Sequence, residues 1–95
     1  MNNLLPPYDL EIEKMVLGSI ISLSSAMNDV RDIINEDCFY DKFNADVFNA
    51  IKALDERGVK IDMMQVNNEL LKKYQLSELG RFIDIVGCST FNVYD

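Results

Sequence analysis

The 95 residues are enough for one domain with a small core, and no more. With 48% hydrophobic and 26% charged residues, the composition is ordinary for a folded globular unit and excludes a disordered one. Sixteen acids against nine bases give a net charge of −7, which repels a phosphate backbone and disfavours direct binding to nucleic acid.

The cysteines and the apolar runs bear on where the protein acts. Cys38 and Cys88 form no C-x-x-C motif, and no secretory apolar segment opens the chain, so both thiols are predicted to be reduced in a cytoplasmic protein. The longest apolar run, residues 15–21, is too short to span a bilayer. We therefore expect no membrane association.

Residues 1–8 are predicted to form an extended lead-in, because Pro6 and Pro7 fit poorly inside a helix. Asp9 is a suitable N-cap for a first helix over residues 10–23. Glu11 and Glu13 lie in its first turn, where the helix dipole favours acids. The first globular element therefore starts at Asp9.

Apolar residues nearly encircle this first helix, which predicts that most of it is buried. Only a narrow stripe is polar or small, and Gly18 in its interior costs about 1 kcal/mol relative to alanine. The favoured interpretation of Gly18 is close packing against another helix of the same domain. The functional interpretation is a partner-facing docking stripe made of Glu11, Lys14, Gly18 and Ser22.

The next segment predicts a second helix over residues 25–35 and a turn over residues 36–40. We expect this turn to direct Phe39 and Tyr40 toward the core, with one ring edge open to solvent. A third helix is predicted over residues 44–57, with one face of aliphatic side chains.

The end of the third helix has a specific signal. Gly58 stands where a left-handed residue is favoured, and Val59 can then contact Leu54. Residues 62–65 read as a capping box that opens a fourth helix, with Ile61 and Val66 as its hydrophobic staple. The predicted buried stripe of the fourth helix consists of Met63, Val66, Leu70 and Tyr74.

A fifth helix is predicted over residues 78–86, buried through Leu79, Phe82, Ile83 and Val86 and ended by Gly87. Ser89 or Thr90 could cap a further helix that is cut short. The predicted domain division is therefore a globular domain at 9–88 and the start of a truncated C-terminal helix or hairpin at 89–95. Apolar residues on such an unfinished helix predict either a missing continuation or an oligomer contact through Phe91, Val93 and Tyr94.

The periodicity is helical almost throughout, and no alternating strand pattern occurs. The predicted fold class is all-α: a small globular bundle of about five to six short helices without a sheet.

Side chains and motifs suited to catalysis, metal binding or nucleotide binding are scarce. The chain has no histidine, which removes Ser-His and Cys-His pairs and the common zinc sites, and its four isolated glycines form no Walker A loop. These absences disfavour the alternative of a small enzyme with a carboxylate site. We predict a non-catalytic chain without metal or cofactor.

The motifs together resemble the N-terminal domain of the DnaB-type bacterial replicative helicase, over nearly the whole chain. The opening resembles the family's Pro-Pro, capping residue, Glu-x-Glu and Val-Leu-Gly at Pro6, Pro7, Asp9, Glu11, Glu13, Val16, Leu17 and Gly18. Four later segments continue the resemblance in order. Residues 37–40 resemble the family's acid-Phe-Tyr turn with an inserted cysteine, and residues 47–50 with 56–58 resemble its Ile-Phe-x-Ala helix that ends in Glu-Arg-Gly. Residues 60–62 resemble its Pro-Ile-Asp, and residues 92–94 resemble its Asn-Val-x-Tyr.

There are also departures from the family pattern. Asn44 stands where the family usually carries histidine, and Gly80-Arg81 replaces a Gly-Gly pair. The helical hairpin through which such domains pair would lie beyond Asp95.

The resemblance implies an ATP-driven helicase ring at the replication fork, with ATP and Mg expected only in a motor domain outside this chain. This domain would form a collar, support hexamer assembly by self-association, and dock primase or a helicase loader, with Glu11 as the foremost partner-facing residue. The alternative is a stand-alone phage or plasmid adaptor of the same fold that binds a host helicase or primase.

Overall fold

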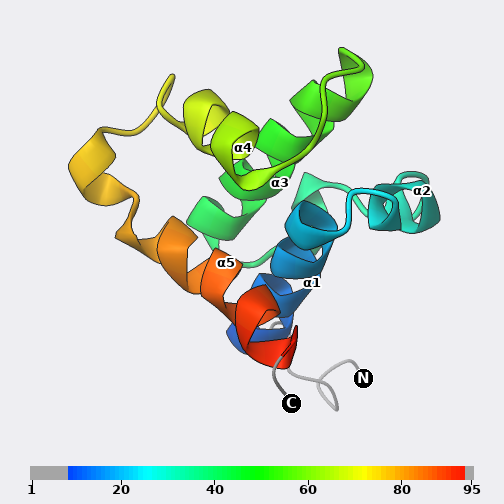
Figure 1. Cartoon of the computed structure of the whole chain (residues 1–95), viewed down its shortest axis with the longest axis horizontal. Coiled ribbons are helices and arrows are strands. Elements are labelled where there is room, and N and C mark those ends of the chain that lie inside the picture. Colours follow the sequence, from blue (N-terminus) through cyan, green and yellow to red (C-terminus); the bar gives the residue numbers. More distant parts are fainter. Residues whose placement is uncertain (1–8, 94–95) are drawn as a thin grey trace.

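The computed structural model describes residues 9–93, with side chains as far as Gly87 (Figure 1). Within this range the elements are five α-helices and two short 3-10 turns, and none is a strand. The all-α prediction is therefore confirmed. The elements are α1 (Leu10–Ser22), α2 (Ala26–Val30), η2 (Glu36–Cys38), α3 (Lys42–Glu56), α4 (Met63–Leu70), η3 (Leu76–Glu78) and α5 (Gly80–Val93).

Helix α1 begins where the sequence predicted. The Asp9 carboxylate accepts hydrogen bonds from the backbone N–H groups of Glu11 and Ile12, at 3.1 and 3.2 Å. These bonds satisfy donors that the first turn of any helix leaves unpaired. The prediction that most of α1 is buried is wrong, because Ile12 is 56% and Met15 43% exposed.

Helix α2 is shorter than the predicted helix over residues 25–35. Its end is followed by tight turns, and Asn35 then adopts an extended backbone and accepts a hydrogen bond from the Asp37 N–H at 2.8 Å. This cap starts η2 and prevents α2 from continuing. Of the two aromatic residues in the next turn, Phe39 is buried, whereas Tyr40 is 63% exposed.

Helix α3 starts two residues before the predicted Asn44, because Asp41 is its N-cap and accepts a hydrogen bond from the Asn44 N–H at 3.0 Å. Its predicted end is confirmed. Gly58 has φ 71°, and the Val59 N–H reaches the Leu54 carbonyl at 2.9 Å. This is the bonding pattern expected of a left-handed glycine stop.

Helix α4 is capped by Asp62, which accepts a hydrogen bond from the Gln65 N–H at 2.8 Å. Val66 and Leu70 are buried as predicted, and Tyr74 packs half-buried against the core after the helix has ended. The predicted buried stripe is wrong at Met63, whose side chain is 54% exposed. Its position in the first turn places it at the rim of the core.

Helix α5 runs without a break through Gly87, so the predicted helix end there is wrong. One interior glycine costs only about 1 kcal/mol, and packing along α1 offsets it. Residues 89–93 therefore continue α5 and do not begin a new helix at Ser89 or Thr90. Leu79 and Phe82 are buried as predicted, but Ile83 is 71% exposed and Ile85 is buried in its place.

The core lies where α1, α3, α4 and α5 meet. Helix α1 packs most extensively on α5, and α3 contacts both α1 and α4 (Figure 1). Helix α3 supplies four fully buried apolar side chains to this centre: Val47, Phe48, Ile51 and Leu54.

Candidate functional site

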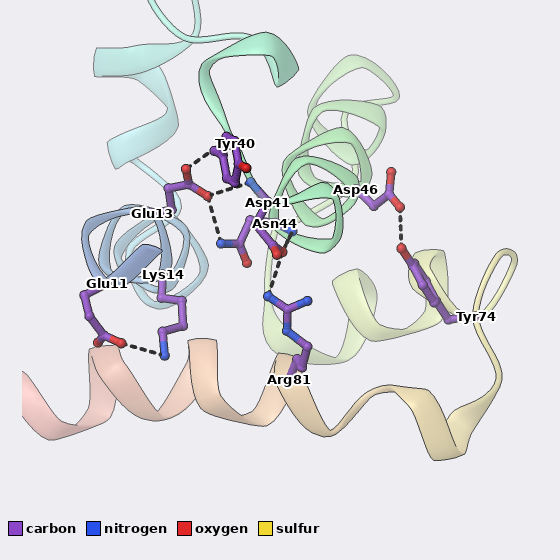
Figure 2. A network of polar contacts seen from close by, with 9 residues as sticks. All are labelled: Glu11, Glu13, Lys14, Tyr40, Asp41, Asn44, Asp46, Tyr74 and Arg81. Carbon is purple, nitrogen blue, oxygen red and sulfur yellow. Dashed lines mark hydrogen bonds and ion pairs between the residues drawn. The ribbon is translucent and has the colours of Figure 1, made fainter. Parts of the chain in front are cut away.

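A buried acid joins α1 to the start of α3 (Figure 2). Glu13 is 7% exposed and accepts hydrogen bonds from the Tyr40 N–H at 2.8 Å, the Asp41 N–H at 3.4 Å and the Asn44 side-chain amide at 2.9 Å. A carboxylate with three donors can remain charged inside a fold. Glu13 therefore holds α1 against the start of α3. One of its hydrogen-bond donors is Asn44, which stands at the family's histidine position.

A second polar contact joins α3 to α5. Arg81 donates to the Asp41 carboxylate at 2.6 Å, and its guanidinium lies 5.1 Å from the centre of the Phe43 ring. Asp41 is also the N-cap of α3. One side chain thus links the start of α3 to the start of α5.

A third polar cluster surrounds Asp46 on α3. The Tyr74 hydroxyl donates to one carboxylate oxygen, while Lys73 lies 3.2 Å and Lys42 3.7 Å from the other. Burial raises the pKa of Asp46, but hydrogen bonds from Tyr74 and Lys73 outweigh it and leave the pKa below its usual value. Burial and the bond to Asp46 raise the pKa of Tyr74 to about 12.

These three clusters tie helices together. Between residues 9 and 93, no group of three His, Cys, Asp or Glu side chains could hold a metal ion. None of the helices in that range is long and apolar enough to cross a membrane.

The predicted docking stripe on α1 is only partly exposed. Glu11 is open to solvent and pairs with Lys14 at 3.0 Å, and Figure 2 shows this pair on the side of α1 that lies over α5. Ser22 is exposed at the end of the helix, Lys14 is half-buried and Gly18 is buried.

Gly18 therefore does not belong to an open surface. Helix α1 makes its largest contact with α5, so a small residue at this position suits close helix packing inside the domain. Of the four predicted partner-facing residues, Glu11 and Ser22 are accessible without rearrangement.

The predicted oligomer contact falls mostly outside what the structure describes. Phe91 and Val93 belong to the last turns of α5, with side chains that are not described, and Tyr94 lies outside the described residues. An oligomer contact through these residues stays a prediction.

Two exposed apolar grooves were missed by the sequence reasoning. The α1–α2 groove has a volume of about 350 Å³ and the α4–α5 groove one of about 490 Å³. The signal was present: α1 carries more apolar positions than one buried face requires. The α1–α2 groove is lined by Ile12, Met15, Val16, Ser19, Ile20, Ala26 and Val30, and the α4–α5 groove by Met63, Met64, Asn67, Phe82, Ile83, Val86 and Gly87.

The fold defines a small all-helical domain with two exposed apolar grooves. The family model described as "DnaB-like helicase N terminal domain" matches residues 5–93. The chain belongs to this family.

Relatives with the same domain are replicative helicases. The chain is 34% identical over 80 residues to the replicative DNA helicase DnaC of Bacillus subtilis, covering 84% of this chain and 18% of that protein. It is 30% identical over 76 residues to the replicative DNA helicase DnaB of Geobacillus stearothermophilus, covering 80% and 17%. The chain thus spans less than a fifth of the length of these relatives.

A solved structure shares the fold. The crystal structure of the N-terminal domain of DnaB helicase from Mycobacterium tuberculosis matches with a TM-score of 0.77 and 29% identity, covering 88% of this chain and 60% of that one.

Proposed function

We propose that this chain is the N-terminal collar domain of a replicative DNA helicase, that it supports hexamer assembly and that it docks primase or a helicase loader. The observation that carries the proposal is the family match across residues 5–93. In this proposal the chain itself is non-catalytic, and it acts in the cytoplasm during DNA replication.

The motor belongs to a part of the protein that this chain does not include. The relatives are named replicative helicases, and the chain aligns with less than a fifth of their length. ATP and Mg would be bound by that remaining part. The collar would then contribute assembly and docking, with little direct binding to DNA because of its negative charge.

Glu11 is the foremost residue for docking. Its side chain is 73% exposed, and it lies beside α5 at the start of α1. An exposed acid can form an ion pair with a basic partner residue, which affects recognition and association rate. Ser22 extends the same stripe at the other end of the helix.

The reading frame after Asp95 separates this proposal from the adaptor alternative. We expect a linker and a Walker A motif within the following few hundred codons, whereas a stop codon directly after Asp95 would favour a stand-alone adaptor that binds a host helicase or primase.

The assembly role is tested on the longer protein by native mass spectrometry. Removing residues 5–93 is expected to lower the fraction of hexamer, because the ring loses the contacts between its collar domains. An unchanged hexamer fraction after this deletion would contradict a role in assembly.

A further inference from the structure

A charged hollow lies between the turns that follow α2 and the C-terminal half of α3. Its volume of about 340 Å³ is near the lower end of the range for small-ligand pockets, so it suits one long side chain and not a whole helix. No charged residue lines the α1–α2 groove or the α4–α5 groove, whereas five line this hollow. They are Arg31 and Asp32 on one wall and Lys52, Asp55 and Glu56 on the other.

Both bases of the hollow already have acidic partners. Arg31 donates two hydrogen bonds to the Asp55 carboxylate, at 2.6 and 2.8 Å, and these bonds hold the pKa of Asp55 below its usual value. Lys52 lies 3.5 Å from the carboxylate of Glu36 in η2. Each of these two pairs is therefore close to neutral.

Two acids of the hollow have no such partner. Asp32 and Glu56 are exposed, and neither forms an ion pair with any residue between 9 and 93. The hydrogen bonds to Asp55 and, at longer range, the charge of Asp32 raise the pKa of Arg31. With both ion pairs included, four carboxylates stand against two cations, which leaves a local charge of −2.

The charge and the lining of the hollow select a cationic side chain with an apolar stem. A phosphate backbone or an anionic lipid is repelled by a local charge of −2. The exposed Ile33 and the half-buried Ile34 offer apolar surface in the same hollow. Arginine matches both features, because its methylene stem can lie on apolar surface while its weakly hydrated guanidinium donates to carboxylates.

The arginine must come from another protein. The chain has three arginines, and each is already paired with an acid of its own chain. A second copy of the chain would have to break one of these pairs to fill the hollow. The pairs are Arg31–Asp55, Arg57–Glu69 and Arg81–Asp41.

We infer that this hollow binds an arginine side chain of a partner protein, with the methylene stem against Ile34 and the guanidinium toward Asp32 and Glu56. The contact goes beyond the proposed function, because it is additional to docking at Glu11 and does not depend on it. Glu11 lies on the side of α1 that is over α5, whereas the hollow lies between the turns after α2 and α3.

The test uses the 95-residue chain and three blocked pentapeptides, each with one central residue between glycines. The central residue is arginine, lysine or citrulline, and citrulline keeps the shape of arginine without its charge. Amide NMR follows each titration. For the arginine peptide we expect saturable shifts at Ile33, Asn35 and Glu56, with a dissociation constant on the order of 1 mM. The citrulline peptide should bind at least about threefold more weakly, and the lysine peptide about twofold more weakly.

Matched variants locate the contact. Asp32→Asn and Glu56→Gln each remove one charge from the hollow and keep the size of the side chain. Asp84→Asn makes the same change in charge at an exposed position of α5 that does not line the hollow. All three side chains are exposed, so the variants should fold, which circular dichroism checks. Asp32→Asn and Glu56→Gln are each expected to weaken the arginine peptide at least about threefold, whereas Asp84→Asn leaves its affinity unchanged.

Four outcomes would overturn the inference. They are absence of saturable shifts, equal affinity for the arginine and citrulline peptides, equal affinity for the arginine and lysine peptides, and equal weakening by Asp32→Asn and Asp84→Asn. The hexamer and reading-frame tests do not enter this result, so each proposal fails separately.

Discussion

Glu13 illustrates how one side chain can hold two helices in register. A buried carboxylate is costly unless donors surround it, and here two backbone N–H groups and the Asn44 amide do so. The backbone donors belong to Tyr40 and Asp41, the turn that leads into α3. Glu13 therefore fixes where α3 starts relative to α1.

Replacing this anchor should destabilise the domain. Glu13→Gln supplies a single acceptor oxygen and places an NH₂ group among donors, so the free energy of unfolding should fall by about 2 kcal/mol. Urea titration followed by circular dichroism measures the change.

Glu11→Gln is the matched control, since this exposed acid lies two residues earlier on α1 and should alter the unfolding free energy by less than about 0.5 kcal/mol. Equal effects of the two substitutions would contradict the anchoring role of Glu13.

Tyr74 gives the domain a pH dependence on the alkaline side. Its pKa in the folded state is about 12, above the ordinary value of 10.0, because burial and the hydrogen bond to Asp46 favour the neutral hydroxyl. The associated stability is present in full below pH 10 and is lost as the pH rises toward 12. Tyr74→Phe should therefore make the free energy of unfolding fall less steeply between these two pH values.

The measurement is a series of urea titrations of both proteins across that interval. Tyr40→Phe is the control, because the Tyr40 side chain is exposed. If Tyr74→Phe and the unchanged protein lost stability in parallel, the Tyr74–Asp46 bond would not be the cause.

At the scale of helices, the ends with strong local signals were predictable. Gly58 stops α3 and Asp62 caps α4 through bonds to neighbours within five residues, so the sequence itself contains the cause. The end of α5 was mispredicted because Gly87 is a weak local signal that helix packing overrides.

Burial was less predictable than helix position. Met63 and Ile83 fit the helical spacing of a buried stripe, yet both are exposed in the α4–α5 groove. Periodicity identifies an apolar face, but whether that face is covered depends on which helix packs there. For the same reason, the exposed side of α1 was not predicted. It also explains why only Glu11 and Ser22 are exposed among the four residues of the predicted docking stripe.

Gly58 ends α3, whereas Gly87 lies inside α5. Replacing each by alanine should change the free energy of unfolding in opposite directions. At Gly58 the space for a Cβ is open but φ is 71°, so Gly58→Ala should lower the free energy of unfolding by about 1 kcal/mol through backbone strain alone. At Gly87 the space is also open and the backbone is helical, so Gly87→Ala should raise it by up to about 1 kcal/mol.

Thermal and urea unfolding of the two variants checks both signs. A stabilising effect of Gly58→Ala would show that the left-handed conformation does not persist in solution, and a destabilising effect of Gly87→Ala would contradict a continuous α5.

At the scale of the whole molecule, the charge is unevenly distributed. Residues 9–41 carry a net charge of −6, whereas residues 42–95 carry −1. Helix α1 belongs to the acidic part and bears both Glu11 and one wall of the α1–α2 groove. An acidic surface favours basic protein partners over nucleic acid, which is what the proposed collar role requires.

The central claim is that this proposed collar domain docks a replication partner. Calorimetric titration of the 95-residue chain tests it most directly. The two titrants are the C-terminal domain of primase and the helicase loader from the same genome. Saturable binding to one of them is predicted, weakened about tenfold by Glu11→Lys and unaffected by Glu56→Lys, an equal change in charge at the exposed end of α3. Absence of binding to both proteins, or equal weakening by the two variants, would contradict the account.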